Sequence, residues 1–133
     1  MEFQIHPILL ADCHYISKLN SCYLLLHKNA VVPWFILVPE VENDWFDLDI
    51  NHQSKIIEEA NLVASFIKHF FVVDKLNFAA IGNVVPQLHL HVVGRSKNDS
   101  CWPQPVWGNL KTFETYLPKD LLKLKEDLGQ YIL

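Results

Sequence analysis

One stretch of helical periodicity, from about Asp49 to Phe71, constrains the fold of this chain more than any other feature. Apolar residues recur there at intervals of three and four positions, which places them on one face of a helix. These residues are Ile56, Ala60, Val63, Ile67 and Phe70. Asp49 is the expected N-cap. The opposite face carries Lys55, Glu58, Glu59, Ser65 and Lys68, which we expect to be ordinary solvated surface.

Short β-prone runs lie on both sides of this helix. Ser21 to Leu26 and Trp34 to Val38 are separated by a loop and predict an antiparallel hairpin. Two further strand candidates, Leu76 to Ile81 and Leu88 to Val93, follow the helix with a turn-prone segment between them.

The last third of the chain changes in composition. Pro103 and Pro105 lie in the segment from Cys101 to Gly108, and they exclude regular helix or central strand there. We expect this segment to form an irregular arm or lid. A terminal helix is predicted from Pro118 to Leu128, because Leu121, Leu124 and Leu128 recur on one side.

Length and cysteine content fit one intracellular domain. The 133 residues, of which 50% are hydrophobic, are enough for one hydrophobic core, so we expect residues 1–133 to form a single domain. Cys13, Cys22 and Cys101 include no Cys-x-x-Cys pair and are odd in number. They indicate buried thiols in a reducing compartment rather than a disulfide framework or a thiolate zinc site.

Charge and hydropathy exclude two classes of partner. The formal net charge is -4 and there is no block of Lys and Arg, which argues against binding a nucleic-acid polymer. Residues 1–10 lack the features of a signal peptide, and no apolar run approaches the roughly 20 residues of a membrane span. We expect a cytoplasmic protein with no membrane partner, whereas a small anionic ligand fits the composition.

The segment from Gln87 to Val93 carries the chemistry. Leu88, Leu90 and Val92 alternate with polar residues, and successive side chains of a strand point to opposite faces. Gln87, His89 and His91 are therefore expected to share one face.

A His-x-His pair on a strand has three interpretations. The two rings are satisfied by local hydrogen bonds, or they ligate a metal ion, for which the sequence marks no third ligand. In the third interpretation a neutral imidazole attacks phosphorus while neighbouring donors hold the phosphate oxygens. That mechanism needs one ring nitrogen free and the other donating its proton, for example to a backbone carbonyl. The pair alone does not decide among the three.

The wider pattern resembles the histidine triad (HIT) family. Gln87-Leu88-His89-Leu90-His91-Val92-Val93 is similar to the motif His-φ-His-φ-His-φ-φ, where φ is apolar, with glutamine in place of the first histidine. The segment from Trp34 to Pro39 is similar to the earlier strand of the family, which ends in proline. Trp102-Pro103 falls where many members carry Trp-Pro. The resemblance extends from about Ser21 to Gly108.

This resemblance implies a fold and a reaction. The HIT fold is an α+β fold, an antiparallel five-stranded sheet with one long helix, here followed by a C-terminal helix, and members are usually homodimers. The predicted strands and helices agree with this fold. The central histidine of the motif, which is His89 here, attacks the α-phosphate and forms a nucleotidyl-histidine intermediate that water then hydrolyses. We therefore expect an enzyme with a small-molecule nucleotide as its partner, and neither a cofactor nor a metal.

The resemblance also implies roles for the neighbours of His89. His91 and Gln87 match the third and first triad positions and are expected to bind phosphate oxygens, although a glutamine does not titrate. Asn83, in the turn before the motif, is expected to bind phosphate, with the backbone amides of Val84 and Val85 beside it. Asn29 lies where relatives bind the ribose hydroxyls.

Two departures weaken the match with hydrolytic members. Besides Gln87, the chain has Trp34 where several relatives carry another histidine. Trp34 is interpreted as a core aromatic or a wall of the pocket, and we assign it no role in the site. The remaining histidines are expected at the surface or in helix caps; these are His6, His14, His27, His52 and His69.

The sequence therefore leaves three alternative functions. The first is a hydrolase or transferase that cleaves a dinucleoside polyphosphate or a nucleoside phosphoramidate at the α-phosphate. The second is a nucleotide-binding module with little or no hydrolytic activity, suggested by the two missing histidines. The third is a metalloprotein that uses His89 and His91 as ligands.

Overall fold

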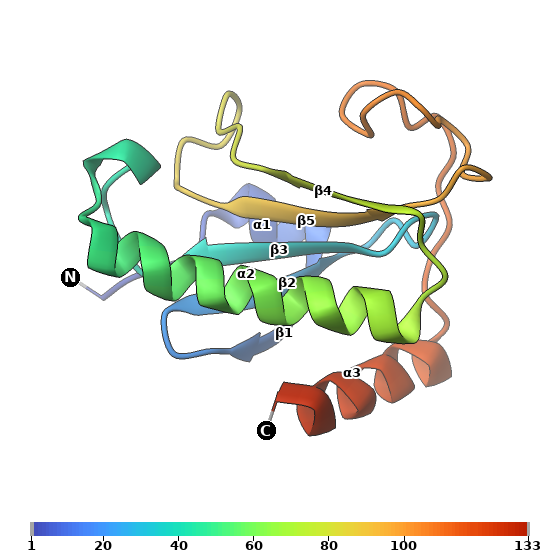
Figure 1. Ribbon diagram of the computed structural model, residues 1–133, viewed down its shortest axis with the longest axis horizontal. Helices are drawn as coiled ribbons and strands as arrows, with labels where there is room; N and C mark the ends of the chain where they lie inside the picture. The colour runs from blue at the N-terminus through green and yellow to red at the C-terminus, as the bar shows by residue number, and fades with distance from the viewer. Residues whose placement is uncertain (1, 133) are drawn as a thin grey trace.

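A five-stranded antiparallel sheet forms the centre of the computed structural model, which describes residues 2–132 (Figure 1). The strand order is β1-β2-β3-β5-β4. The strands are β1 (Cys13–Lys18), β2 (Cys22–His27), β3 (Trp34–Pro39), β4 (Lys75–Ala79) and β5 (Leu90–Arg95). The helices are α1 (Pro7–Asp12), the 3-10 turn η1 (Trp45–Asp47), α2 (Ile50–Phe70) and α3 (Pro118–Ile132). The α+β architecture and the five strands confirm the expected fold.

The long helix α2 covers one face of the sheet, as Figure 1 shows. Its N-cap is Asp49, whose carboxylate accepts a hydrogen bond from the backbone N–H of His52 at 2.8 Å. Ile56, Ala60, Val63 and Ile67 are buried against the strands, as predicted. Phe70 was placed on this face wrongly. It is 42% exposed, because Phe66, one turn earlier, takes the buried position and stacks against it.

The prediction of a solvated polar face is wrong for Glu59. This side chain is only 9% exposed and reaches the turn between β1 and β2. Its two carboxylate oxygens accept hydrogen bonds from the backbone N–H groups of Ser21 at 2.7 Å and Cys22 at 2.9 Å. The N–H groups of this partly buried turn need acceptors, and a carboxylate supplies two in one plane.

The strand boundaries differ from the predicted ones mainly around β5. β2 and β3 agree with the predicted hairpin to within one residue. β5 begins at Leu90, so Gln87 to His89 precede the strand rather than belong to it. The residue pattern had not indicated α1 or β1, and β1 follows α1 without a linking residue.

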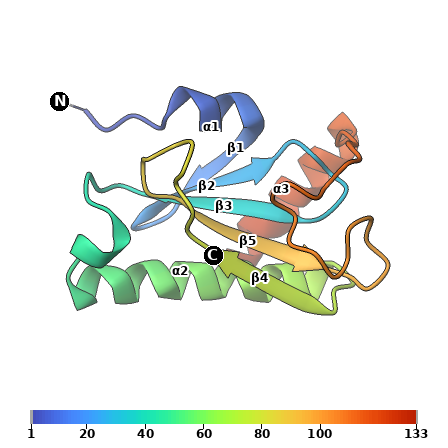
Figure 2. The same ribbon diagram turned by 90° about the horizontal axis from the view of Figure 1, so that it is seen from above.

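The second face of the sheet is covered by α1, the N-terminal segment and the arm after β5. Figure 2 shows α1 and α2 on opposite sides of the sheet. A second apolar cluster fills this side and includes Leu9, Trp34, Ile36, Val85 and Val106. The segment predicted to be an irregular arm contains turns and no helix or strand. α3 lies on the other side, where Leu124 and Leu128 join the core beneath α2.

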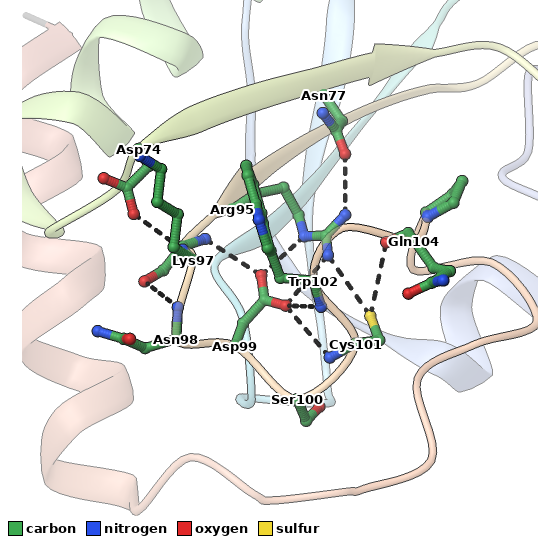
Figure 3. A network of polar contacts seen from close by, with 12 residues as sticks. Asp74, Asn77, Arg95, Lys97, Asn98, Asp99, Ser100, Cys101, Trp102 and Gln104 are labelled. Carbon is green, nitrogen blue, oxygen red and sulfur yellow. Dashed lines mark hydrogen bonds and ion pairs between the residues drawn. The ribbon is translucent and has the colours of Figure 1, made fainter.

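A buried ion pair holds the arm to the end of β5 (Figure 3). The guanidinium of Arg95 donates to both carboxylate oxygens of Asp99 and to the side-chain oxygen of Asn77 on β4. Asp99 in turn accepts from the backbone N–H groups of Ser96, Cys101 and Trp102. The hydrogen bonds from Arg95 lower the pKa of Asp99 to about 2. These bonds therefore fix the start of the arm, although the arm has no regular secondary structure.

We expect Glu59→Ala to destabilise the protein. The substitution leaves the buried N–H of Cys22 and the partly buried N–H of Ser21 without an acceptor, which costs about 2–4 kcal/mol in the free energy of unfolding. Urea denaturation followed by circular dichroism measures this change. Glu58→Ala, at the exposed neighbouring position of α2, is the matched control and should change stability by less than about 0.5 kcal/mol. Equal losses in the two variants would contradict the role given to Glu59.

Candidate active site around His89 and His91

His89 and His91 lie together at the start of β5. Their ring centroids are 4.9 Å apart, and the two residues are 6% and 7% exposed. His91 pairs with Ile36 of β3 and Ala79 of β4, so it lies in the interior of the sheet. The two rings thus share one face, while Leu90 between them packs beneath α2.

The tautomer of His89 follows from one hydrogen bond. Its Nδ1 lies 2.8 Å from the backbone carbonyl oxygen of Gln87. A carbonyl oxygen only accepts, so Nδ1 carries the proton in this bond. In the neutral ring the lone pair is therefore on Nε2, as a nucleophilic imidazole requires.

His91 has the opposite arrangement. The indole N–H of Trp34 donates to Nδ1 of His91 at 3.0 Å in a buried contact. The neutral ring of His91 therefore carries its proton on Nε2 and acts there as a donor. Burial, reinforced by His89 and His27, lowers the pKa of His91 to about 3. His91 is thus a neutral hydrogen-bond donor throughout the ordinary pH range.

Trp34 is the residue of this site that sequence reasoning missed. Its ring stacks on His27 with centroids 4.2 Å apart and meets the ring of Trp107 edge to face at 6.0 Å. Trp34 and His91 lie diagonally across β3 and β5, because Ile36 is directly opposite His91. The register of these strands was the signal needed, and the sequence did not fix it.

His27 was expected at the surface or in a cap, and this expectation is wrong. It is half-buried against Trp34, and burial lowers its pKa. Its Nδ1 accepts a hydrogen bond from the backbone N–H of Asn29 at 3.1 Å. His27 therefore belongs to the aromatic surroundings of the site.

The side chain of Gln87 is engaged by the N-terminal segment. Its Oε1 accepts from the backbone N–H of His6, and its Nε2 donates to the backbone carbonyl of Gln4, both at 2.8 Å. The main-chain carbonyl of Gln87 therefore contacts His89. Its side-chain amide contacts residues more than 80 positions earlier in the chain.

The two asparagines differ in their surroundings. Asn29 is buried, and its side chain donates to the carbonyl of Thr112 and accepts from the N–H groups of Val31 and Glu114. Asn83 is exposed in the loop between β4 and β5, next to Gly82, whose φ of 69° allows the chain to turn there. Asn29 thus connects the loop after β2 to the segment before α3, while Asn83 stands at the surface.

A cavity of about 430 Å³ adjoins the start of β5. It lies between η1 and the loop after β4, which occur at the same end of the sheet (Figure 2). Its lining includes His89, the aromatic residues Trp45 and Phe78, and Leu88. This volume is in the range of small-molecule pockets.

The sequence model of the HIT domain matches residues 10–98, about two thirds of the chain. The chain belongs to the HIT domain family. The match includes α2, all five strands and the whole of the segment from Gln87 to Val93. A search among curated proteins gave no match.

Solved structures of HIT proteins are similar to this chain over nearly its whole length. The histidine triad protein of Bradyrhizobium japonicum is 33% identical, with a TM-score of 0.91 and coverage of 98% of both chains. That of Sinorhizobium meliloti is 32% identical, with a TM-score of 0.90 and coverage of 97% and 96%. The protein of Marinobacter aquaeolei is 35% identical, with a TM-score of 0.89 and coverage of 97% and 95%.

In the segment that resembles the triad motif, this chain has Gln87, His89 and His91. Among residues 2–132, no group of three His, Cys, Asp or Glu side chains is arranged to hold a metal ion. The helices in the same range are too short or too polar to cross a membrane.

The low pKa of His91 predicts a loss of stability in acid. Below the ordinary pKa of about 6.5 the unfolded chain binds a proton at position 91 that the folded chain excludes until about pH 3. The free energy of unfolding should therefore fall between pH 6.5 and 3, by up to about 1.4 kcal/mol per pH unit from this group. Urea denaturation of the native protein and of His91→Asn at several pH values measures the difference. Parallel pH curves for the two proteins would contradict the assignment.

Proposed function

We propose that this HIT protein is a nucleotidyl hydrolase or transferase that cleaves at the α-phosphate of a dinucleoside polyphosphate or a nucleoside phosphoramidate. The observation that carries the proposal is the hydrogen bond between Nδ1 of His89 and the carbonyl of Gln87. It leaves the lone pair of Nε2 as the nucleophile without any proton transfer before attack.

In the first step Nε2 of His89 forms a bond to the α-phosphorus. The bond from phosphorus to the leaving oxygen or nitrogen breaks, and the leaving group takes the electron pair. The resulting nucleotidyl-imidazole is positively charged, and the carbonyl of Gln87 stabilises it by accepting from Nδ1–H. In the second step water attacks the phosphorus and loses a proton to solvent, the electron pair of the P–N bond returns to Nε2, and the mononucleotide leaves with neutral His89 restored.

His91 supplies a donor for the charge that develops on phosphate. Its Nε2–H is fixed by the bond from Trp34, and the low pKa of the ring keeps it neutral. A donor that is oriented before the reaction stabilises the transition state without reorganisation. Trp107 lies edge to face with His91 at 5.1 Å, and its buried indole N–H has no partner among the described residues, so it is a second candidate donor.

The roles proposed for the other residues depend on how the nucleotide enters. The exposed Asn83 is proposed to bind phosphate from the loop before the motif. The amide of Gln87, which the motif led us to expect at a phosphate oxygen, is hydrogen-bonded to the main chain of His6 and Gln4. Asn29 is proposed to bind a ribose hydroxyl through the second hydrogen of its side-chain amide, because Thr112 takes only one. A nucleoside in the cavity lined by His89 has aromatic neighbours in Trp45 and Phe78.

A nucleotide-binding module with little or no hydrolysis is the alternative. It is favoured by the weak proton donors around His89, since Gln87 does not titrate and His91 remains neutral. A leaving group of high pKa then departs slowly, and the pocket binds more than it cleaves.

We expect His89→Ala to abolish turnover of diadenosine tetraphosphate and adenosine phosphoramidate, with a loss of at least about 1,000-fold in kcat. AMP release is followed by chromatography. In the native protein, rapid quenching and mass spectrometry should reveal a nucleotidyl adduct on the peptide that contains His89.

The control is His69→Ala, an exposed histidine of α2 far along the sequence from the motif. It should retain native activity. Equal turnover in His89→Ala and native protein would refute the nucleophile. Micromolar AMP binding with background turnover in the native protein would favour the binding module instead.

We propose that two copies pair through β4. Among residues 2–132, this strand has a neighbour on one side only, which is β5. Two apolar side chains on and just after this strand are exposed: Phe78 by 48% and Ile81 by 42%. An exposed apolar edge strand favours pairing with another chain, and a second copy would extend the sheet to ten strands.

We expect Phe78→Glu to shift the protein from dimer to monomer, because it places a charge in the proposed interface. Light scattering after size-exclusion chromatography measures the mass. Phe113→Glu is the matched control, since Phe113 is at least as exposed as Phe78 but lies in the segment before α3. A monomeric native protein, or a dimer in both variants, would contradict pairing through β4.

A further inference from the structure

The amide of Gln87 binds the N-terminal segment as a neighbouring strand would. Its acceptor and its donor meet the N–H of His6 and the carbonyl of Gln4, two residues apart, at 2.8 Å each. A side-chain amide has an acceptor and a donor side by side in one plane, as a peptide group does. The ring nitrogens of a histidine point in divergent directions, so the histidine usual at this motif position would not make both bonds.

The segment held by Gln87 is tied to the rest of the molecule at other points. Phe3 stacks on Tyr23 with centroids 5.7 Å apart, and Phe3 and Ile5 pack against the apolar cluster that includes Trp34. The ring of His6 accepts from the N–H of Ile8 and caps α1. Gln87 is therefore anchored to an ordered part of the fold.

The same residue supplies the carbonyl that orients the nucleophile. His89 and Gln87 precede β5, so the sheet does not fix this carbonyl by strand pairing. The side chain of Gln87 holds the residue in place through its two hydrogen bonds, to Gln4 and to His6. A shift of the carbonyl would release Nδ1 of His89 and let the ring adopt either tautomer.

We propose that Gln87 is a positioning residue rather than a phosphate ligand. Its side chain clamps the segment from Gln4 to His6, and this clamp fixes the carbonyl that keeps the lone pair of His89 on Nε2. The inference rests on the proposed function for its effect on turnover, but the clamp and the tautomer are measurable without any substrate.

The test combines Gln87→Leu, which keeps the size and removes both hydrogen bonds, with His6→Pro, which removes the N–H from the other side together with the capping ring. The backbone φ of -53° at His6 suits proline. His6→Ala controls for loss of the helix cap, and Gln130→Leu makes the same change as Gln87→Leu at an exposed position of α3. Each variant is made in the full chain.

Two readouts need no activity. In Gln87→Leu the amide proton of His6 should exchange at least about tenfold faster, because it loses its acceptor. The ¹⁵N spectrum of the His89 ring should change from a single Nδ1–H tautomer to a mixture in Gln87→Leu and in His6→Pro. His6→Ala and Gln130→Leu should keep the native spectrum.

The kinetic readout separates positioning from phosphate binding. A positioning role predicts that kcat falls by about 10- to 100-fold while KM stays within about twofold. The double variant Gln87→Leu/His6→Pro should lose no more kcat than Gln87→Leu alone, because both changes break the hydrogen bond between Gln87 and His6. A raised KM with native His6 exchange and a native His89 tautomer would overturn the proposal. If the native protein has no turnover, the proposed function fails, and exchange and tautomer still decide the clamp.

Discussion

Burial of one face of the sheet under α2 is the constraint on which the rest of the molecule depends. Leu90 and Val92 must point into that core, so His91 is forced to the other face of β5. The same alternation in β3 sends Phe35 and Leu37 beneath the helix and brings Trp34 to the side of His91. The hydrogen bond between Trp34 and His91 follows from this pairing of strands.

The site combines two imidazoles held in opposite tautomers. A main-chain acceptor fixes the proton of His89 on Nδ1, and a side-chain donor fixes the proton of His91 on Nε2. Neither ring depends on a charged neighbour for this arrangement. Trp34 and Gln87 stand where the resemblance to the HIT motif led us to expect histidines. In this chain the indole N–H of Trp34 donates a hydrogen bond to His91, and the main-chain oxygen of Gln87 accepts a hydrogen bond from Nδ1–H of His89.

The local patterns in the sequence were sufficient for the main elements. Periodicity located α2 and its N-cap Asp49, and alternation placed His89 and His91 on a common face. The patterns were not sufficient where a contact joins distant residues. Glu59 looks like any polar helix residue until the β1–β2 turn meets it, and Gln87 meets Gln4 and His6 only through the folded chain. The register of β3 against β5, which decides the role of Trp34, is likewise a property of the whole sheet.

The opposite tautomers have a consequence for selectivity toward electrophiles. Both histidines are nearly equally buried, so access does not distinguish them. The lone pair of His91 is already occupied by the indole of Trp34, whereas that of His89 is unoccupied by any protein donor in the described residues. An electron-poor centre that enters this pair therefore meets one reactive nitrogen and one N–H, and the chain needs no steric gate to choose which ring becomes modified.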